Sequence, residues 1–381
     1  MTGLLLLLPG CRKKTAVQRP QPAPEKVLRP KTEPRIRVLL DEGFGEGEVF
    51  GAERAERILF RVSGGTLHLI GLEQGAERTA EAATGFRLRP RGEFLQFKGR
   101  RYRGYLDVFV NPYGVPVVVN DLPLEDYLRG VLPRELGPDR YPYPEALKAQ
   151  AVAARTFALH ERGRFADRGF DIYATEQSQV YAGADAETEM SDRAVASTRG
   201  VVAVFQGAPI VAVYCSTCGG QTEAFDAVFS GGRFPYLRGG VACPDDHSPY
   251  HRWRESRSGE ELERWCRQKG LRVGRLRDLV VTERSPAGRA LTVVLEGSEG
   301  AAEVRGTDLR FGLNLRSTWW ESVEIARDAA GYVEGITIEG RGWGHGVGLC
   351  QLGAVELARR GRSWEQILAY YYPGVTCTRW Y

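Results

Sequence analysis

Glu135 is the first candidate for chemistry, because it lies between Pro133 and Gly137 in the segment LPRELGP, just before a stretch rich in alanine. Proline fixes the backbone, so a turn flanked by proline and glycine is expected to hold this carboxylate in one place. A carboxylic acid held in this way can donate and accept a proton. A glutamate that is merely solvated in a loop is the alternative, and this segment alone leaves both interpretations open.

A second group of candidates lies in the glycine-rich segment GRGWGHGVG, residues 340–348. Alternating glycines let the backbone approach a ligand or another strand, and they leave Trp343 and His345 on an uncrowded surface. Trp343 could stack on a sugar ring and His345 could donate a hydrogen bond, unless His345 is a structural histidine in a tight turn. Gln351 begins the next expected helix and could point into the same cleft. The spacing differs from G-x-G-x-x-G, which argues against dinucleotide binding.

Cysteine and histidine form a third group, with side chains that zinc accepts as ligands. The possible metal ligands are Cys215, Cys218, Cys243 and His247. Because an exported protein can keep disulfides, we favour a disulfide between Cys218 and Cys243 over a zinc site. The Cys215-x-x-Cys218 pair ends an expected strand and does not open a helix, so thioredoxin-like redox chemistry is not expected.

The chain has seven cysteines, and two that are not among these candidate ligands, Cys350 and Cys377, lie near its C-terminal end. We expect a second disulfide between Cys350 and Cys377, because it would tie the last helix to the C-terminal strand.

The composition indicates a globular protein of 381 residues, with 43% hydrophobic and 26% charged residues. The net charge is +4, and lysine and arginine are dispersed along the chain. The chain has no cluster of basic residues that could follow a phosphate backbone, so a nucleic-acid partner is not expected.

The N-terminus has features of an export signal followed by a tether. The run Leu4 to Leu8 is too short to span a bilayer, and Leu8-Pro9-Gly10-Cys11 resembles a bacterial lipobox with Cys11 as the lipidated residue. No basic segment precedes the leucines, so a chance match is the alternative. Residues 12–34 are rich in proline and lysine, which suits an extended tether between a membrane anchor and a folded body. The sequence thus predicts a lipid-anchored protein outside the cytoplasm.

The rest of the chain predicts an α+β fold. Short, partly alternating segments between glycine-rich turns favour strands, and a β-rich N-terminal region is expected over residues 35–104. Residues 105–381 are expected to form a mixed α/β core. Within this core the pattern predicts a helix over residues 144–161, opened by a proline and rich in alanine, and a strand, glycine loop and helix near the C-terminal end.

Six segments occur in an order that resembles the SpoIID/LytB family of stage II sporulation protein D and the amidase enhancers. They are LPLEDYLRGVLPRELG, PEALKAQAVAARTFAL, SQVYAG, YCSTCGGQTE, FPYLRGG and GWGHGVGLCQLGA. The resemblance covers residues 105–381 and implies a SpoIID-like core. It implies either a peptidoglycan lytic transglycosylase, which needs no cofactor, or a non-catalytic protein that binds peptidoglycan glycan strands and enhances a cell-wall amidase. A structural envelope lipoprotein without a ligand is a third hypothesis.

The resemblance assigns the catalytic acid to Glu135, since the family's glutamate lies in the same segment before the alanine-rich helix. The family often has Met-Pro after this glutamate, where this chain has Leu136-Gly137. A lytic transglycosylase uses the 6-hydroxyl of N-acetylmuramic acid as an intramolecular nucleophile, so one carboxylic acid of raised pKa can serve as acid and then base. A Glu135 set among apolar atoms favours the enzyme, and one paired with Arg134 or Arg155 favours the binding protein.

The remaining family-matched positions are candidates for substrate binding. They are Lys148, Arg155, Ser178, Gln179, Tyr181, Ser216, Thr217, Gly219, Trp343, His345 and Gln351. Turn and hairpin chemistry is the alternative for the short polar residues, and a solvated helix face is the alternative for Lys148 and Arg155. Some sporulation members have a zinc site next to the QVY segment. Here that region, FDIYATEQSQVY, has no cysteine or histidine, so any zinc would belong to the Cys215 group.

Overall fold

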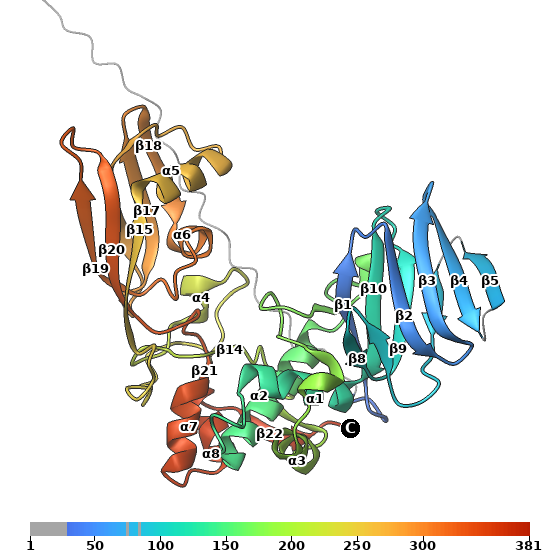
Figure 1. Ribbon diagram of the computed structural model, residues 1–381. Helices are drawn as coiled ribbons and strands as arrows, with labels where there is room; N and C mark the ends of the chain where they lie inside the picture. The colour runs from blue at the N-terminus through green and yellow to red at the C-terminus, as the bar shows by residue number, and fades with distance from the viewer. Residues whose placement is uncertain (1–28, 74–75, 83–84) are drawn as a thin grey trace, which may run out of the picture.

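The computed structural model describes residues 29–73, 76–82 and 85–381, and it shows two β-rich lobes that stand on a base of helices (Figure 1). Helices and strands are mixed along the chain, so the prediction of an α+β fold is confirmed. The predicted export signal, Cys11 and most of the tether lie outside the described residues. Within the described residues, no helix combines the length and the apolar character that a membrane span requires.

Two sheets form the N-terminal lobe, in the strand orders β11-β1-β10-β9-β6 and β5-β4-β3-β2-β7-β8. The first sheet consists of β11 (Ile172–Tyr173), β1 (Arg35–Glu42), β10 (Pro116–Pro123), β9 (Tyr105–Val110) and β6 (Phe86–Leu88). The second consists of β5 (Ala76–Ala82), β4 (Thr66–Glu73), β3 (Ala55–Ser63), β2 (Glu46–Ala52), β7 (Leu95–Phe97) and β8 (Arg100–Tyr102). Alternate residues such as Val38, Val108 and Phe60 are buried in one core that the two sheets share.

The boundary expected between residues 104 and 105 falls inside the first sheet. β9 and β10 pair with each other, and they also pair with β6 and β1 respectively. The β-rich lobe therefore extends to Pro123 and leads directly into the first helix.

The helical base surrounds one central helix. The helices of the base are α1 (Leu124–Glu135), α2 (Pro144–Glu161), α3 (Glu189–Ser197), α7 (Gln351–Arg359) and α8 (Trp364–Tyr371), with the short helix η2 (Gly183–Ala186). The short helix η1 (Ala166–Arg168) lies against the N-terminal lobe. The predicted helix over residues 144–161 is confirmed as α2. Its alanines are buried, and α1, α3, α7 and α8 all pack against it. A small sheet in the order β13-β12-β22 joins the base, from β13 (Ala208–Pro209), β12 (Val201–Phe205) and β22 (Thr376–Arg379).

The sequence did not predict α1, which Gly130 and Pro133 argued against. Gly130 is required by packing, because a Cβ atom there would lie 2.6 Å from the Tyr181 ring and 2.8 Å from the Gly183 carbonyl oxygen. Pro133 lies inside the helix, in its last turn, where its ring nitrogen has no hydrogen to donate to the carbonyl oxygen of the preceding turn. Glu135 is thus the last residue of a helix, and the expectation of a turn at this position is wrong.

The second lobe contains two three-stranded sheets and two helices around its own core. One sheet is β15 (Arg252–Ser258), β20 (Val333–Arg341) and β19 (Trp320–Arg327), and the other is β16 (Leu276–Arg284), β17 (Ala290–Gly297) and β18 (Gly300–Arg305). The helices are α5 (Gly259–Gln268) and α6 (Gly306–Gly312), and α4 (Phe225–Val228) lies below the lobe (Figure 1). Trp253, Trp265 and Trp320 form the centre of the core.

Two short strands join this lobe to the base. β14 (Tyr214–Cys215) pairs in parallel with β21 (Leu349–Cys350), which leads directly into α7. The predicted order of strand, glycine loop and helix is confirmed as β20, residues 342–348 and α7. This pairing brings the STCGG segment beside the start of α7.

Candidate functional site

Glu135 projects from the end of α1 toward the start of α7, and both its carboxylate oxygens have partners. Oε1 accepts a hydrogen bond from the backbone N–H of Val180 (2.9 Å), and Oε2 accepts one from Nε2 of Gln351 (3.3 Å). The side chain is half-buried. Within the part of the chain that the structure describes, Glu135 forms no ion pair, and Arg155 instead binds Glu125.

Burial is the main cause that raises the pKa of Glu135 above its ordinary value. Hydrogen bonds from Val180, Gln351 and Tyr214 oppose this shift, and the negative charge of Glu176 adds to it. The position at a helix C-terminus acts in the same direction as burial, because the helix dipole disfavours negative charge there. The net result is a carboxyl group that keeps its proton to a higher pH than a solvated glutamate.

A buried glutamine holds two tyrosines beneath this carboxyl group. Gln179 is fully buried, and its Nε2 donates to the Tyr214 hydroxyl (2.8 Å) and to the Ala154 carbonyl oxygen (3.3 Å). Its Oε1 accepts from the Tyr127 hydroxyl (3.1 Å). Gln179 therefore positions Tyr214 beside the acid and is too deeply buried to contact a substrate itself. Sequence reasoning missed Tyr214, although it belongs to the quoted YCSTCGGQTE segment.

His345 does not point into a binding site, so the prediction that it donates to a substrate is wrong. Its Nε2 donates to the Tyr214 carbonyl oxygen (2.8 Å), and its Nδ1 accepts from the Val347 N–H (3.0 Å). Burial lowers the pKa of His345 to about 3, with a further contribution from Arg310. The ring is therefore neutral and both nitrogens are used, which is the structural histidine of the alternative interpretation.

The glycines of this loop are required because neighbouring backbone and a buried arginine side chain pack closely against them. Gly348 has φ +73°, and a Cβ atom there would lie 2.1 Å from the Val213 carbonyl oxygen. A Cβ atom at Gly346, which has φ +79°, would lie 2.1 Å from the Arg289 guanidinium. The glycines thus let β21 reach β14, which is what places Gln351 near Glu135.

Trp343 remains available on the surface, with 40% of its area exposed. Its ring packs edge-on against Tyr250 at 4.4 Å between centroids, and the Arg316 guanidinium lies over Tyr250 at 4.8 Å. An exposed aromatic ring held by neighbours can stack on the apolar face of a sugar, so this predicted role stays a prediction.

Several of the predicted binding residues are structural. Arg155 is fully buried and binds both carboxylate oxygens of Glu125, at 2.9 and 2.7 Å. Tyr181 is 4% exposed and donates its hydroxyl to Asn120 Oδ1 (2.8 Å). Thr217 is buried, and its hydroxyl is hydrogen-bonded to that of Ser248 (2.9 Å). None of these three side chains can reach a glycan, because all three are buried and have partners within the protein. The sequence alone did not reveal this burial.

Four further predicted residues have contacts within the protein. Lys148 pairs with Glu145 on the same helix (2.7 Å), and the Ser178 hydroxyl accepts from the Tyr173 N–H (3.1 Å). The Ser216 carbonyl oxygen accepts from the Leu352 N–H (3.1 Å), which fixes the start of α7. The Gly219 N–H donates to Asp245 Oδ2 (2.8 Å). Lys148, Ser178 and Ser216 are half-buried, whereas Gly219 is buried.

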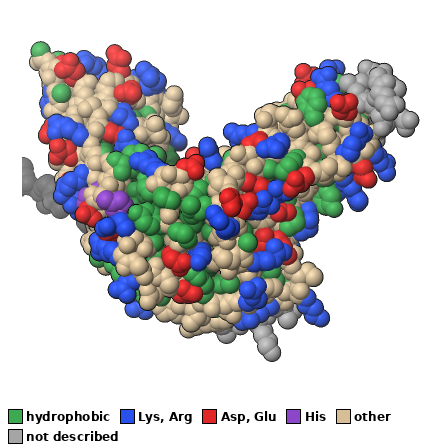
Figure 2. Space-filling view, turned by 60° about the horizontal axis from the view of Figure 1, so that its bottom comes forward, with side chains coloured by type: hydrophobic (Ala, Val, Ile, Leu, Met, Phe, Trp, Pro, Cys, Tyr) green, Lys and Arg blue, Asp and Glu red, His purple; other side chains and the backbone are tan. Residues whose placement is uncertain are grey.

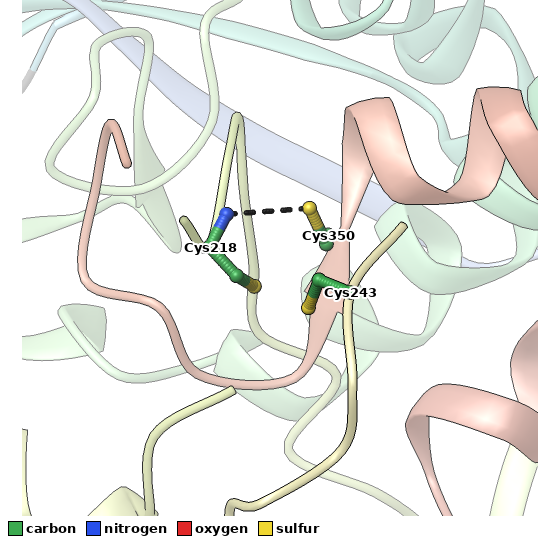
Figure 3. Close-up of side chains that lie close together, drawn as sticks. All are labelled: Cys218, Cys243 and Cys350. Carbon is green, nitrogen blue, oxygen red and sulfur yellow. Dashed lines mark hydrogen bonds between the residues drawn. The ribbon is translucent and has the colours of Figure 1, made fainter. Parts of the chain in front are cut away.

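The cysteines do not form the predicted disulfides, since all six in the described residues are free. Cys218, Cys243 and Cys350 lie together, with their three sulfur atoms within 4.8 Å of one another (Figure 3). The predicted metal ligands Cys215 and His247 are not members of this group. The expected disulfide between Cys350 and Cys377 is wrong, because both cysteines are free. Cys377 lies on β22, where it is opposite Ala203 of β12 in the sheet.

Comparison with known proteins gives matches over most of the described chain. Residues 114–205 match the family model described as stage II sporulation protein, and residues 223–348 match a domain of unknown function. Stage II sporulation protein D of Bacillus subtilis is 32% identical over 288 residues, which cover 69% of this chain and 78% of the relative.

Two other relatives extend the comparison. An uncharacterized protein of Brachyspira hyodysenteriae is 35% identical over 278 residues, which cover 73% of this chain and 72% of the relative. The amidase enhancer of Bacillus subtilis is 29% identical over 302 residues, which cover 66% of this chain and 40% of that protein.

Proposed function

Because the chain belongs to the SpoIID/LytB family of stage II sporulation protein D, we propose that it is a peptidoglycan lytic transglycosylase with Glu135 as its single acid and base. The observation that supports this proposal most is the environment of Glu135. Its carboxyl group is oriented by two hydrogen bonds, is not neutralised by an arginine or lysine, and has a raised pKa.

The proposed reaction uses the two carboxyl oxygens differently. Oε1 is held by a backbone N–H at 2.9 Å, whereas the contact of Oε2 with Gln351 is longer, at 3.3 Å. Oε2 is therefore the oxygen that is free to carry the transferable proton. Protonated Glu135 donates this proton to the glycosidic oxygen as the bond to the muramyl anomeric carbon breaks.

The second step returns the proton to Glu135. The 6-hydroxyl of the same N-acetylmuramic acid attacks the anomeric carbon, and the Glu135 carboxylate accepts the hydroxyl proton. The product is a 1,6-anhydromuramyl end, and no water is consumed. Since the attacking group belongs to the substrate, its high effective concentration replaces the activated water of a hydrolase.

A hydrolase would need a second carboxylate, and two buried carboxylates of this chain, Asp171 and Glu223, are engaged by other groups. Asp171 binds Arg37 (2.8 Å), and Glu223 is buried, with Oε1 accepting from the Ala224 N–H (2.8 Å). Glu176 is exposed, and its negative charge raises the pKa of Glu135. Glu176 is thus the residue to test if water takes part.

A hollow between the two lobes offers room for an extended polymer. Figure 2 shows this hollow, with hydrophobic side chains gathered on the surface at its base. The helical base of the fold, which includes α1, lies below this hollow (Figure 1). We place the glycan strand across this hollow, with Trp343 as a stacking surface for one sugar. An anchor at Cys11 would hold the protein on the outer side of the cytoplasmic membrane, where peptidoglycan lies.

A second candidate function is that of a non-catalytic protein that enhances a cell-wall amidase. The relative named amidase enhancer favours it, and the two functions can share one glycan-binding surface. They differ in whether Glu135 transfers a proton.

The chemistry of the products separates these functions. Purified protein and its Glu135→Gln variant are incubated with glycan strands that carry or lack stem peptides, and the products are identified by mass spectrometry. Anhydromuramyl ends from the wild type alone support the proposal. Reducing ends would make the protein a hydrolase, and binding without cleavage would favour the amidase enhancer.

A further inference from the structure

Three buried cysteines from distant segments meet beside the start of α7. Cys218 follows β14, Cys243 precedes β15, and Cys350 ends β21. Their sulfur atoms all lie within 4.8 Å of one another. Figure 3 shows the three side chains gathered from separate segments. We propose that Cys218, Cys243 and Cys350 bind one thiophilic divalent cation, with zinc as the best fit, in a structural centre that fixes the start of α7.

The spacing of the sulfur atoms suits a metal better than a disulfide network. Zinc binds thiolates at about 2.3 Å in tetrahedral geometry, which puts neighbouring sulfurs about 3.8 Å apart. Separations of up to 4.8 Å need only a small contraction around a cation. A disulfide needs about 2.0 Å, and it would leave the third of these buried thiols unpaired.

The backbone around Cys350 favours its thiolate form. Cys350 is the N-cap of α7, and its Sγ accepts from the N–H of Gly353 (3.4 Å) and from the N–H of Cys218 (3.3 Å). Two donors at a helix N-terminus stabilise a negatively charged sulfur, which is the form that binds a metal.

Two polar side chains around the cluster supply a second line of support. The Tyr371 hydroxyl is buried and has no hydrogen-bond partner, and it lies beside Cys350 Sγ, since a Cβ atom at Gly353 would meet both. Asp245 Oδ2 lies 3.3 Å from Cys350 Sγ, and Oδ1 of the same carboxylate is 2.7 Å from His251 Nδ1. A carboxylate in contact with a ligand is typical of the surroundings of a bound metal.

Cys243 is the member of the cluster nearest to solvent. A surface cavity of about 480 Å³ is lined by Cys243, Pro244, Leu357 and Tyr370, among others. Cys243 is 7% exposed, whereas Cys218 and Cys350 are fully buried behind it.

Cys215 provides a matched control within the same segment. Its Sγ is 3.8 Å from that of Cys218, and it is also buried, but it lies outside the group of three. A site defined by the C-x-x-C spacing would need Cys215, whereas the proposed site does not.

The centre would hold three chain segments at one point next to the candidate acid. Cys350 immediately precedes Gln351, whose amide contacts Glu135. A cation at Cys350 would therefore keep Gln351 in place. Metal binding itself is independent of the proposed function, and only this link to Glu135 rests on it.

The test measures metal and thiols on the intact protein. Elemental analysis of the chain purified without chelators is expected to give one zinc per chain, with Cys218, Cys243 and Cys350 alkylated as free thiols after denaturation with a chelator. Single variants Cys218→Ser, Cys243→Ser and Cys350→Ser are expected to lose at least nine-tenths of the zinc, and Cys215→Ser and Glu135→Gln are expected to keep it. The Glu135→Gln result separates this proposal from the catalytic one.

Cobalt substitution keeps the proposal falsifiable if a serine variant fails to fold. Wild-type protein loaded with Co²⁺ is expected to show thiolate-to-cobalt charge-transfer absorption and tetrahedral visible bands, both absent after addition of excess chelator. A disulfide between any two of the three cysteines would overturn the proposal. So would metal-free protein that shows no cobalt bands, or equal loss of zinc in Cys215→Ser.

Discussion

Gln351 donates its side-chain amide to Oε2 of Glu135 across 3.3 Å, although 216 positions separate the two residues in the chain. This contact joins the end of α1 to the start of α7, and it orients the carboxyl group that we propose as the proton donor.

Replacing Glu135 by glutamine is expected to reduce release of glycan fragments by about 10²–10⁴-fold, the usual contribution of a general acid and base. The amide keeps the shape of the side chain and cannot donate the proton. The rate is measured from soluble fragments with peptidoglycan as substrate. Glu176→Gln is the matched control and should retain activity within a few-fold. An equal loss in both variants would contradict a single-acid mechanism.

The pH dependence of kcat/KM should report the raised pKa of Glu135. The acid must be protonated to donate, so activity falls as pH rises through this pKa, which lies above that of an ordinary glutamate. Two variants should move this alkaline limb in opposite directions. Gln351→Leu removes a hydrogen bond that lowers the pKa, so the limb moves to higher pH.

Glu176→Gln removes a negative charge that raises the pKa of Glu135, so the limb moves to lower pH. Profiles of kcat/KM for the three proteins are compared in one buffer series at constant ionic strength. Shifts of the same sign in both variants would mean that Glu135 is not the titrating acid.

Arg155→Met is expected to destabilise the protein by about 3–5 kcal/mol, because it leaves Glu125 buried without its partner. Lys148→Met, on the same helix, removes a partly exposed pair with Glu145 and should cost less than about 1 kcal/mol. Urea unfolding followed by circular dichroism measures both values. A small effect of Arg155→Met would show that the buried pair with Glu125 contributes little to stability.

Gln179→Leu is expected to cost about 1–3 kcal/mol, because the hydroxyls of Tyr127 and Tyr214 lose a buried partner. Gln150 gives a matched control, since it is equally buried and its amide has no hydrogen-bond partner. Gln150→Leu should be neutral or stabilising. The same unfolding measurement applies, and similar costs for the two variants would show that the tyrosine network contributes nothing.

His345 should make the protein sensitive to acid. Its pKa is about 3 in the folded protein and 6.5 when unperturbed, so the folded state favours the neutral ring. The stability due to His345 is complete above pH 6.5 and is lost as pH falls from 6.5 toward 3. The Tm of wild-type protein should therefore fall more steeply between pH 6.5 and 4 than that of His345→Gln. His160, which is 38% exposed, is the control, and His160→Gln should follow the wild type.

The α2 helix and the order of strand, glycine loop and helix could be predicted because their signals are local. Pro144 and the buried alanines are adjacent in sequence, and so are the glycines of residues 340–348. α1 could not be predicted, because its glycine at position 130 is justified only by the Tyr181 ring that packs on it. Local propensity disfavoured a helix that tertiary packing requires.

Only those parts of the candidate site that have a motif in the sequence could be predicted. Glu135 and Gln351 were identified through family motifs, but the role of Arg155 depends on Glu125, 30 positions earlier in the chain. The cluster of Cys350 with Cys218 depends on the parallel pairing of β14 with β21, which no local pattern predicts. Buried side chains that bind one another look like binding residues until their partners are known.

The pairing of β14 with β21 has a consequence for the order of events as the chain is made. Glu135 emerges from the ribosome long before Gln351, and the strand that carries Gln351 to it follows the whole second lobe. A chain still in synthesis or transit thus holds its acid without the amide that orients it. The contact between Glu135 and Gln351 can therefore form only after residues 349–351 have been made.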